Sequence, residues 1–254
     1  MLEKERSIKY AVKRLQAQTN ARDHVNEILF SSAKRILGVS KDFIGSGGRL
    51  LSEKKLRSLA KDIALDSGNL IRSYTEKYCR ASMKVLGSDT DAVSGIIDNE
   101  RFGRTFMERN DEYMAGFADD VVNLIKAGVH MGYNEEKILS SMRTGYQDPY
   151  VNSMITKANR GGALIETPSY GRGKMHASYA NILRNVQDTI SYAWGIEEGA
   201  DASSRGAIGF TVHRCSSYPC AVCDDQCGYV HKMVDQLPPY HNRCVCRVEF
   251  VFKK

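Results

Sequence analysis

The sequence predicts a mainly helical α+β protein, in which a helical N-terminal body carries a small C-terminal β cap. Apolar residues recur at helical spacing through the first 160 residues. A stretch rich in glycine follows, and the last forty residues alternate like strands around clustered cysteines and histidines. We therefore expect a helical body over residues 1–160, a loop or linker over 161–174 and a C-terminal domain over 175–254.

The N-terminal body begins with two stripes of apolar residues. Ile8, Val12 and Leu15 recur at helical spacing near the start of the chain. Glycines near residue 45 interrupt this pattern, and a second stripe of Leu, Ile and Tyr residues runs through 56–78. Cys79 ends the second stripe, and we expect it to be a small buried hydrophobic side chain.

The clearest helical pattern lies between Asp111 and His130, where apolar residues form one continuous face. We expect Gly132 to close this helix. Asn134, followed by two glutamates, predicts the start of another helix, because Asn caps helix N-termini and acidic residues favour the first turn. A further helix is predicted from about residue 175 to 198.

The C-terminal region contains two strand-like segments. Residues 208–213 and 246–252 alternate apolar and polar side chains and are rich in β-branched and aromatic residues. The cysteine loops lie between them. We expect these two strands to flank the loops in a small cap.

Composition and charge narrow the class of protein. The chain has 254 residues and a net charge of +6 that is spread along its length, so charge alone gives little support for a nucleic-acid-binding arm. The first ten residues alternate charges and lack the apolar core of a signal peptide, and no stretch approaches the ~18 apolar residues of a transmembrane helix. We therefore expect a reducing cytoplasm, where clustered cysteines bind metals more often than they form disulfides.

Six of the seven cysteines and three of the six histidines lie between residues 213 and 246. Cys220 and Cys223 form a Cys-x2-Cys pair, and a loop of 17 residues leads to His241, Cys244 and Cys246. Zinc is bound in a tetrahedron by thiolates and imidazoles at such spacings. The first choice of ligands is Cys220, Cys223, His241 and Cys244, with Cys246 interchangeable with Cys244 because alternate residues of an extended segment face the same side.

Other assignments of the cluster are left open. Cys215, Cys227 and His231 are spare candidate ligands, so a second ion or a different set of four is possible. Disulfides such as Cys215–Cys220, or a redox-active Cys-x2-Cys pair, are less favoured, because neither a secretion signal nor a βαβ pattern is present. A catalytic zinc is not indicated, because the sequence has no His-Glu-x-x-His motif, and we predict no catalytic residues.

Basic residues close to the cluster in sequence are expected to offset its charge. A site of three cysteines and one histidine carries a net charge of −1 with zinc bound. The residues that could offset this charge from beside the ligands are Arg214, Lys232, Arg243 and Arg247.

The cluster belongs to a longer signature. This signature begins with Cys220 and Cys223, continues through Gly228 and His231, and ends in Pro238-Pro239-Tyr240-His241-Asn242-Arg243-Cys244-Val245-Cys246. It resembles the C-terminal signature of the phage Mu F-like minor head proteins, a family of tailed-phage head-morphogenesis proteins. That family typically ends in Pro-Pro-x-His-Pro-Asn-Cys-Arg-Cys. Here Asn242-Arg243 stands in place of Pro-Asn, and Val245 in place of Arg.

The resemblance covers about residues 175–252 and implies a structural role, not an enzymatic one. It implies a minor head protein that associates with phage portal and capsid proteins during assembly, in the host cytoplasm and then in the virion. It further implies an oligomeric arrangement in the particle and no membrane association, and it leaves non-specific contact with DNA open. Structural zinc would hold rigid a docking surface that is too small to hold itself.

Two alternative functions are left open. A treble-clef zinc nuclease would use His231 and His241 as a catalytic pair, but His241 is needed as a ligand and a strand ends the chain where that fold has a closing helix. The second alternative is a zinc-dependent interaction module unrelated to phage.

Overall fold

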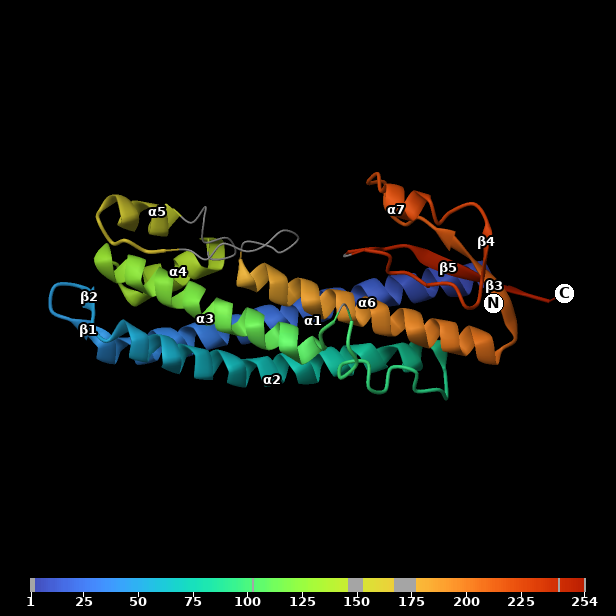
Figure 1. Cartoon of the computed structure of the whole chain (residues 1–254), viewed down its shortest axis with the longest axis horizontal. Coiled ribbons are helices and arrows are strands. Elements are labelled where there is room, and N and C mark those ends of the chain that lie inside the picture. The colour runs from blue at the N-terminus through green and yellow to red at the C-terminus, as the bar shows by residue number, and fades with distance from the viewer. Residues whose placement is uncertain (1–2, 102, 146–152, 167–176, 242, 254) are drawn as a thin grey trace. The chain divides into compact units, whose positions relative to one another are not determined.

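The computed structural model describes residues 3–101, 103–145, 153–166, 177–241 and 243–253. It is 64% helical, with small antiparallel sheets, and confirms the predicted mainly helical α+β class (Figure 1). The chain forms two compact units: unit 1 comprises residues 1–23, 73–106 and 184–254, and unit 2 comprises 24–72 and 107–183. Three long helices contribute to both units: α1 (Glu3–Ser40), α2 (Glu53–Leu86) and α6 (Ser178–Ser204).

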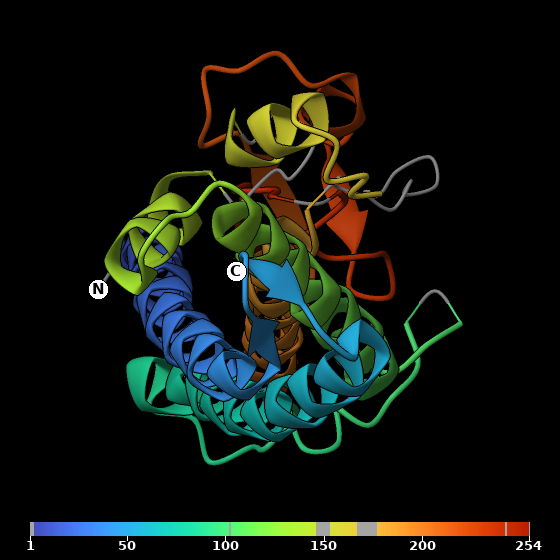
Figure 2. The same cartoon turned by 90° about the vertical axis from the view of Figure 1, so that its left-hand side faces the viewer.

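Unit 2 is helical apart from one short hairpin. Its other elements are η1 (Lys41–Phe43), β1 (Ile44–Gly45), β2 (Arg49–Leu50), α3 (Phe106–His130, of which Phe106 is counted with unit 1), α4 (Glu135–Gly145) and α5 (Ser153–Arg160). β1 pairs antiparallel with β2, and Gly47 and Gly48 make the turn at φ 81° and 71°, which favours glycine. The hairpin thus returns the chain from α1 to α2, and these helices lie side by side in unit 2 (Figure 2).

The predicted helix boundaries in unit 2 are largely confirmed. Gly132 has φ 67° directly after α3, as a C-terminal glycine should. The side chain of Asn134 accepts a hydrogen bond from the amide N–H of Lys137 at 3.0 Å, which is the predicted N-cap of α4. α3 begins at Phe106, five residues before the expected Asp111. α5 was not predicted, because its eight residues give too short a pattern.

Unit 1 contains the C-terminal cap. β3 (Ala207–His213) lies in the centre of a three-stranded antiparallel sheet, between β4 (Val230–Lys232) and β5 (Arg247–Phe252). α7 (Ala221–Asp224) lies in the loop between β3 and β4 (Figure 1). The two predicted strands are therefore confirmed as β3 and β5. β4 was missed because three residues are too few for an alternation to register.

The helices of unit 1 pack around Trp194. Its indole N–H donates to the carbonyl of Tyr78 at 2.7 Å, and its ring lies 5.1 Å from that of Tyr10, whose hydroxyl donates to the Trp194 carbonyl. This arrangement pairs each polar end of the two buried aromatic residues with a hydrogen-bond acceptor. Cys79 is also buried, as predicted, and burial raises the pKa of its thiol to about 12.

The N-terminal half of α1 buries a face that the apolar pattern did not indicate. Ile8, Val12 and Leu15 are 44%, 48% and 37% exposed. The buried face instead carries small and polar residues: Ser7, Tyr10, Ala11, Arg14, Ala17 and Gln18. The helix is thus confirmed, but hydrophobicity did not predict its orientation, because polar side chains on this face bind backbone groups elsewhere in unit 1.

The two units are discontinuous in sequence, whereas the predicted domains were continuous. The division into 1–160, 161–174 and 175–254 stays a prediction, and residues 167–176 of the expected linker and helix start lie outside the described residues. None of the helices in the described part of the chain is both long and apolar enough to cross a membrane.

Candidate metal centre

The first pair of candidate ligands lies on one helical turn. Cys220 directly precedes α7, and the amide N–H of Cys223 donates to the Cys220 carbonyl at 3.1 Å. Such a turn brings two thiols that are three residues apart to the same side, so that both can bind one metal ion. Cys223 is buried and Cys220 is half-buried.

The other candidates come from the loop between β4 and β5. The amide N–H of Cys244 donates to the carbonyl of His241 at 3.1 Å, and Arg243 adopts φ 62° between them. This left-handed conformation costs a non-glycine residue roughly 1–2 kcal/mol. It makes the tight turn that brings His241 and Cys244 to one side of the loop. Cys244 and Cys246 are both buried.

The two halves meet at distances that suit a tetrahedral metal. The sulfur of Cys223 lies 3.8 Å from that of Cys244 and 3.0 Å from Nε2 of His241, which is in turn 3.3 Å from the sulfur of Cys220. Metal–sulfur bonds of about 2.3 Å at tetrahedral angles place two sulfurs about 3.8 Å apart. The same geometry places a sulfur and a nitrogen about 3.5 Å apart, which is close to the distances from His241 to Cys220 and Cys223.

Five candidate donors form two overlapping groups. Cys220, Cys223 and His241 make one group and Cys223, Cys244 and Cys246 the other, and within each group the donor atoms lie within 4.8 Å of one another. Cys223 belongs to both. The structure therefore brings the five residues expected from the sequence into two groups of three that share Cys223.

The crowding of the thiols shifts their pKa values in opposite directions. A hydrogen bond from Cys246 lowers the pKa of Cys244 to about 5, while burial raises that of Cys223 to about 12. The same hydrogen bond, together with burial, raises the pKa of Cys246. A bound cation would displace the thiol protons, so its affinity should rise with pH.

The spare candidates lie outside both groups found among the described residues. Cys215 is exposed, and the thiol of Cys227 points to the carbonyl of Cys223 at 3.3 Å. His231 is buried, with Nε2 2.9 Å from the carbonyl of Gln226 and its ring stacked on Phe210 at 4.8 Å. These contacts account for His231 as a core residue of the cap.

Two side chains of α1 bind backbone carbonyls at Cys246 and in β5. A guanidinium N–H of Arg14 donates to the carbonyl of Cys246 at 2.6 Å, and the hydroxyl of Ser7 donates to the carbonyl of Val248. Both are buried, and both lie more than 200 residues away in sequence. No local sequence signal could have revealed them, because a lone Arg or Ser in a helical pattern usually faces solvent.

The basic residues expected around the cluster make other contacts. Arg214 pairs with Asp224, and Arg247 lies 3.5 Å from Glu249 and donates to Ser7 at 3.0 Å. The backbone N–H of Arg243 donates to the carboxylate of Asp188 on α6 at 3.2 Å. The pKa of Arg214 is raised, and the main cause is its hydrogen bond to Asp224.

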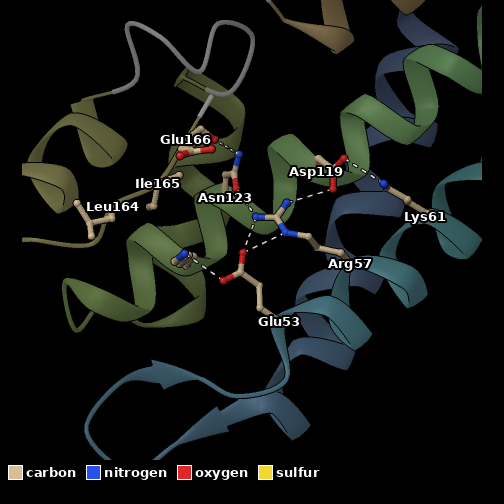
Figure 3. Close-up of a pocket in the computed structure, with 9 residues that line it drawn as sticks. Glu53, Arg57, Lys61, Asp119, Asn123, Leu164, Ile165 and Glu166 are labelled. Atoms are coloured by element: carbon tan, nitrogen blue, oxygen red, sulfur yellow. Dashed lines mark hydrogen bonds and ion pairs between the residues drawn. The ribbon is translucent and has the colours of Figure 1, made fainter. Parts of the chain in front are cut away.

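Unit 2 contains a separate pocket of about 550 Å³ that is lined by charged residues (Figure 3). Arg57 lies at its centre, with hydrogen bonds to Glu53 at 2.6 Å, Asn123 at 2.7 Å and Asp119 at 3.1 Å. Lys61 pairs with Asp119, and Lys126 pairs with Glu53. Burial raises the pKa of Glu53, but the hydrogen bonds from Arg57 and Lys126 outweigh it and lower the pKa overall.

This pocket has the character of an ion-pair network between helices. Each of its three cations already has a carboxylate partner within the pocket. A ligand carboxylate or phosphate would have to displace these partners. We therefore assign the pocket a structural role in joining α2 to α3, and take the cysteine cluster as the candidate functional site.

Comparison with known proteins identifies no significantly similar protein. No protein-family model matches the sequence, no curated protein is significantly similar to it, and no solved structure significantly resembles its fold.

Proposed function

We propose that the cysteine–histidine cluster of unit 1 is a structural zinc site. The observation that carries the proposal is the position of the Cys223 sulfur, 3.8 Å from the Cys244 sulfur and 3.0 Å from Nε2 of His241. Thiolates and imidazole in a tetrahedron are the donors that suit zinc. The ligands would be Cys220, Cys223, His241 and either Cys244 or Cys246.

A structural role is favoured over a catalytic one by the number of protein donors. Four protein ligands fill the zinc coordination shell and leave no position for a reactive water. The cap also needs stabilisation, since three of the eight buried residues in its apolar cluster are candidate ligands: Cys223, Cys244 and Cys246. Bound zinc would supply a crosslink between the α7 turn and the loop before β5 that this small core lacks.

We further propose that the chain acts as a phage minor head protein, with the zinc-stabilised cap as its docking module. The support is the signature from Cys220 to Cys246, of which Cys220, Cys223, His241, Cys244 and Cys246 lie in the cluster. The partners would be portal and capsid proteins, met in the host cytoplasm during assembly and kept in the virion. This role requires no catalytic residue, and rests on likeness of sequence rather than of fold.

The nuclease alternative gains no support from the described residues. A histidine that acts on a phosphodiester must reach its substrate. His231 is 4% exposed, stacked on Phe210 and hydrogen-bonded to the Gln226 carbonyl. We therefore do not pursue a His231–His241 catalytic pair.

Two cysteine variants test both parts of the proposal. Elemental analysis of the purified wild-type chain should find about one zinc per chain, Cys223→Ser should lose most of it, and the exposed Cys215→Ser should retain it. A wild-type chain that is free of metal when purified under reducing conditions would refute the zinc site.

The same variants test the assembly role when they are supplied during phage growth. We expect Cys215→Ser to enter particles at the wild-type level and Cys223→Ser to be excluded from them. Incorporation of Cys223→Ser at the wild-type level would refute the docking role of the cap and leave the zinc site untouched.

A further inference from the structure

We propose that one face of α6 positions the His241–Cys244 half of the metal centre, with Gly195 and Asp188 as the positioning residues. This inference rests on the proposed zinc site. Asp188, Gly195 and Gly199 are seven and four residues apart, so they share one face of the helix. All three meet the segment from Leu237 to Arg243, which belongs to unit 1 as they do.

Gly195 allows the backbone of this segment to touch the helix. A Cβ atom at position 195 would lie 2.6 Å from the carbonyl oxygen of Pro238, closer than real side chains approach. The atom in the way is a backbone carbonyl oxygen, and it cannot rotate aside as the end of a flexible side chain could. At Gly199 the close neighbour is the side chain of Leu237, whose Cδ1 would lie 2.5 Å from an added Cβ atom. Gly195 is therefore the glycine that the close approach of this segment needs.

Asp188 holds the other end of the segment. Its carboxylate accepts the amide N–H of Arg243 at 3.2 Å, at the residue whose φ of 62° makes the turn before Cys244. Around it, the guanidinium of Arg101 lies 3.7 Å from the Tyr192 ring and reaches the Asp188 carbonyl at 3.5 Å. A hydrogen bond from a backbone amide to a carboxylate is charge-assisted, and it favours the strained turn over alternatives.

The two contacts bracket His241. Pro238 lies three residues before it and Arg243 two residues after it, so the helix determines where the imidazole enters the site. Supporting contacts of this kind typically change metal affinity by 10–100-fold when they are lost. α6 would therefore act on the metal through His241 and Cys244 without contacting it.

The test compares two helical glycines in the full-length chain. Zinc affinity is measured by competition with a chelator, and cobalt(II) serves as a spectroscopic substitute for zinc. Gly195→Ala should weaken zinc binding about 10–100-fold and alter the cobalt absorption spectrum as His241 leaves the shell. The helix content of the metal-free chain should not fall, because alanine favours helix over glycine. Gly38→Ala is the matched control in α1, since nothing lies within 4 Å of its Cβ position, and it should bind like wild type.

A second pair of variants tests the proposal even if the Gly195→Ala chain does not fold. Asp188→Ala removes the acceptor for the Arg243 amide and should weaken zinc binding about tenfold, whereas Asp188→Asn keeps an acceptor oxygen and should restore affinity to within about threefold of wild type. Wild-type affinity and cobalt spectra in both Gly195→Ala and Asp188→Ala would overturn the positioning role. A wild-type chain that binds neither metal would instead refute the zinc site itself.

Discussion

Glu198 is a carboxyl group enclosed within unit 1. Burial raises its pKa to about 8, and Arg14 of α1 opposes this shift without cancelling it. Arg6 of α1 also lowers the pKa, while Glu3 and Asp201 raise it. At neutral pH the side chain is therefore largely protonated in the folded chain, whereas in the unfolded chain it ionises near its ordinary value of 4.5.

We predict that Glu198→Gln stabilises the protein increasingly as the pH rises. Because the folded pKa is raised, the contribution of Glu198 is most favourable below pH 4.5 and is lost as the pH rises toward about 8. The variant lacks this loss, so its advantage over wild type should grow to roughly 4 kcal/mol by pH 8. Urea unfolding of both proteins from pH 5 to 8.5, at equal metal saturation, measures the difference. A constant difference across this range would contradict the prediction.

At the scale of elements, Arg57 joins α2 to α3 within unit 2. It bonds Glu53 on its own helix and Asp119 and Asn123 on α3, and its side chain is 27% exposed. Removing one partner from a partly buried network leaves the remaining charges without compensation, which costs more than the loss of an exposed pair.

We predict that Arg57→Met lowers the free energy of unfolding by about 1–2 kcal/mol. The matched control is Arg35→Met, which removes the exposed pair between Arg35 and Asp66 on α1 and α2 and should cost less than about 0.5 kcal/mol. Urea unfolding followed by far-ultraviolet circular dichroism measures both. Equal losses in the two variants would show that the pocket network adds nothing to an ordinary surface pair.

Helices could be predicted from the sequence where the pattern of apolar residues extends over many residues. The face of α3 is apolar throughout, so its position and its buried residues, including Phe117, Val121 and Ile125, followed from the sequence. The first half of α1 was predictable as a helix but not in orientation. Its buried Arg14 and Ser7 face backbone carbonyls that only the folded β5 segment presents. Hydrophobic periodicity does not register such contacts.

At the scale of the whole molecule, the candidate metal centre belongs to unit 1 and the charged pocket to unit 2. We predict that a chelator destabilises the two units unequally. Removal of the proposed zinc should expose the backbone amides of β3, β4 and β5 to hydrogen exchange within unit 1, while those of α3 in unit 2 keep their protection. Hydrogen exchange followed by mass spectrometry, with and without chelator, measures both. Equal loss of protection in β5 and α3 would contradict a local role for the metal.

The sequence alone determined the class of fold and the five candidate ligands, because helical periodicity and Cys-x2-Cys spacing are local properties. It left His231 as a spare candidate ligand, since residue type is the same whether an imidazole stacks on Phe210 or faces a metal. Only the tertiary structure placed Arg14, Asp188 and Gly195 around the cluster. The physical reason is distance along the chain: these contacts join residues 43 to 232 positions apart, where spacing rules carry no information.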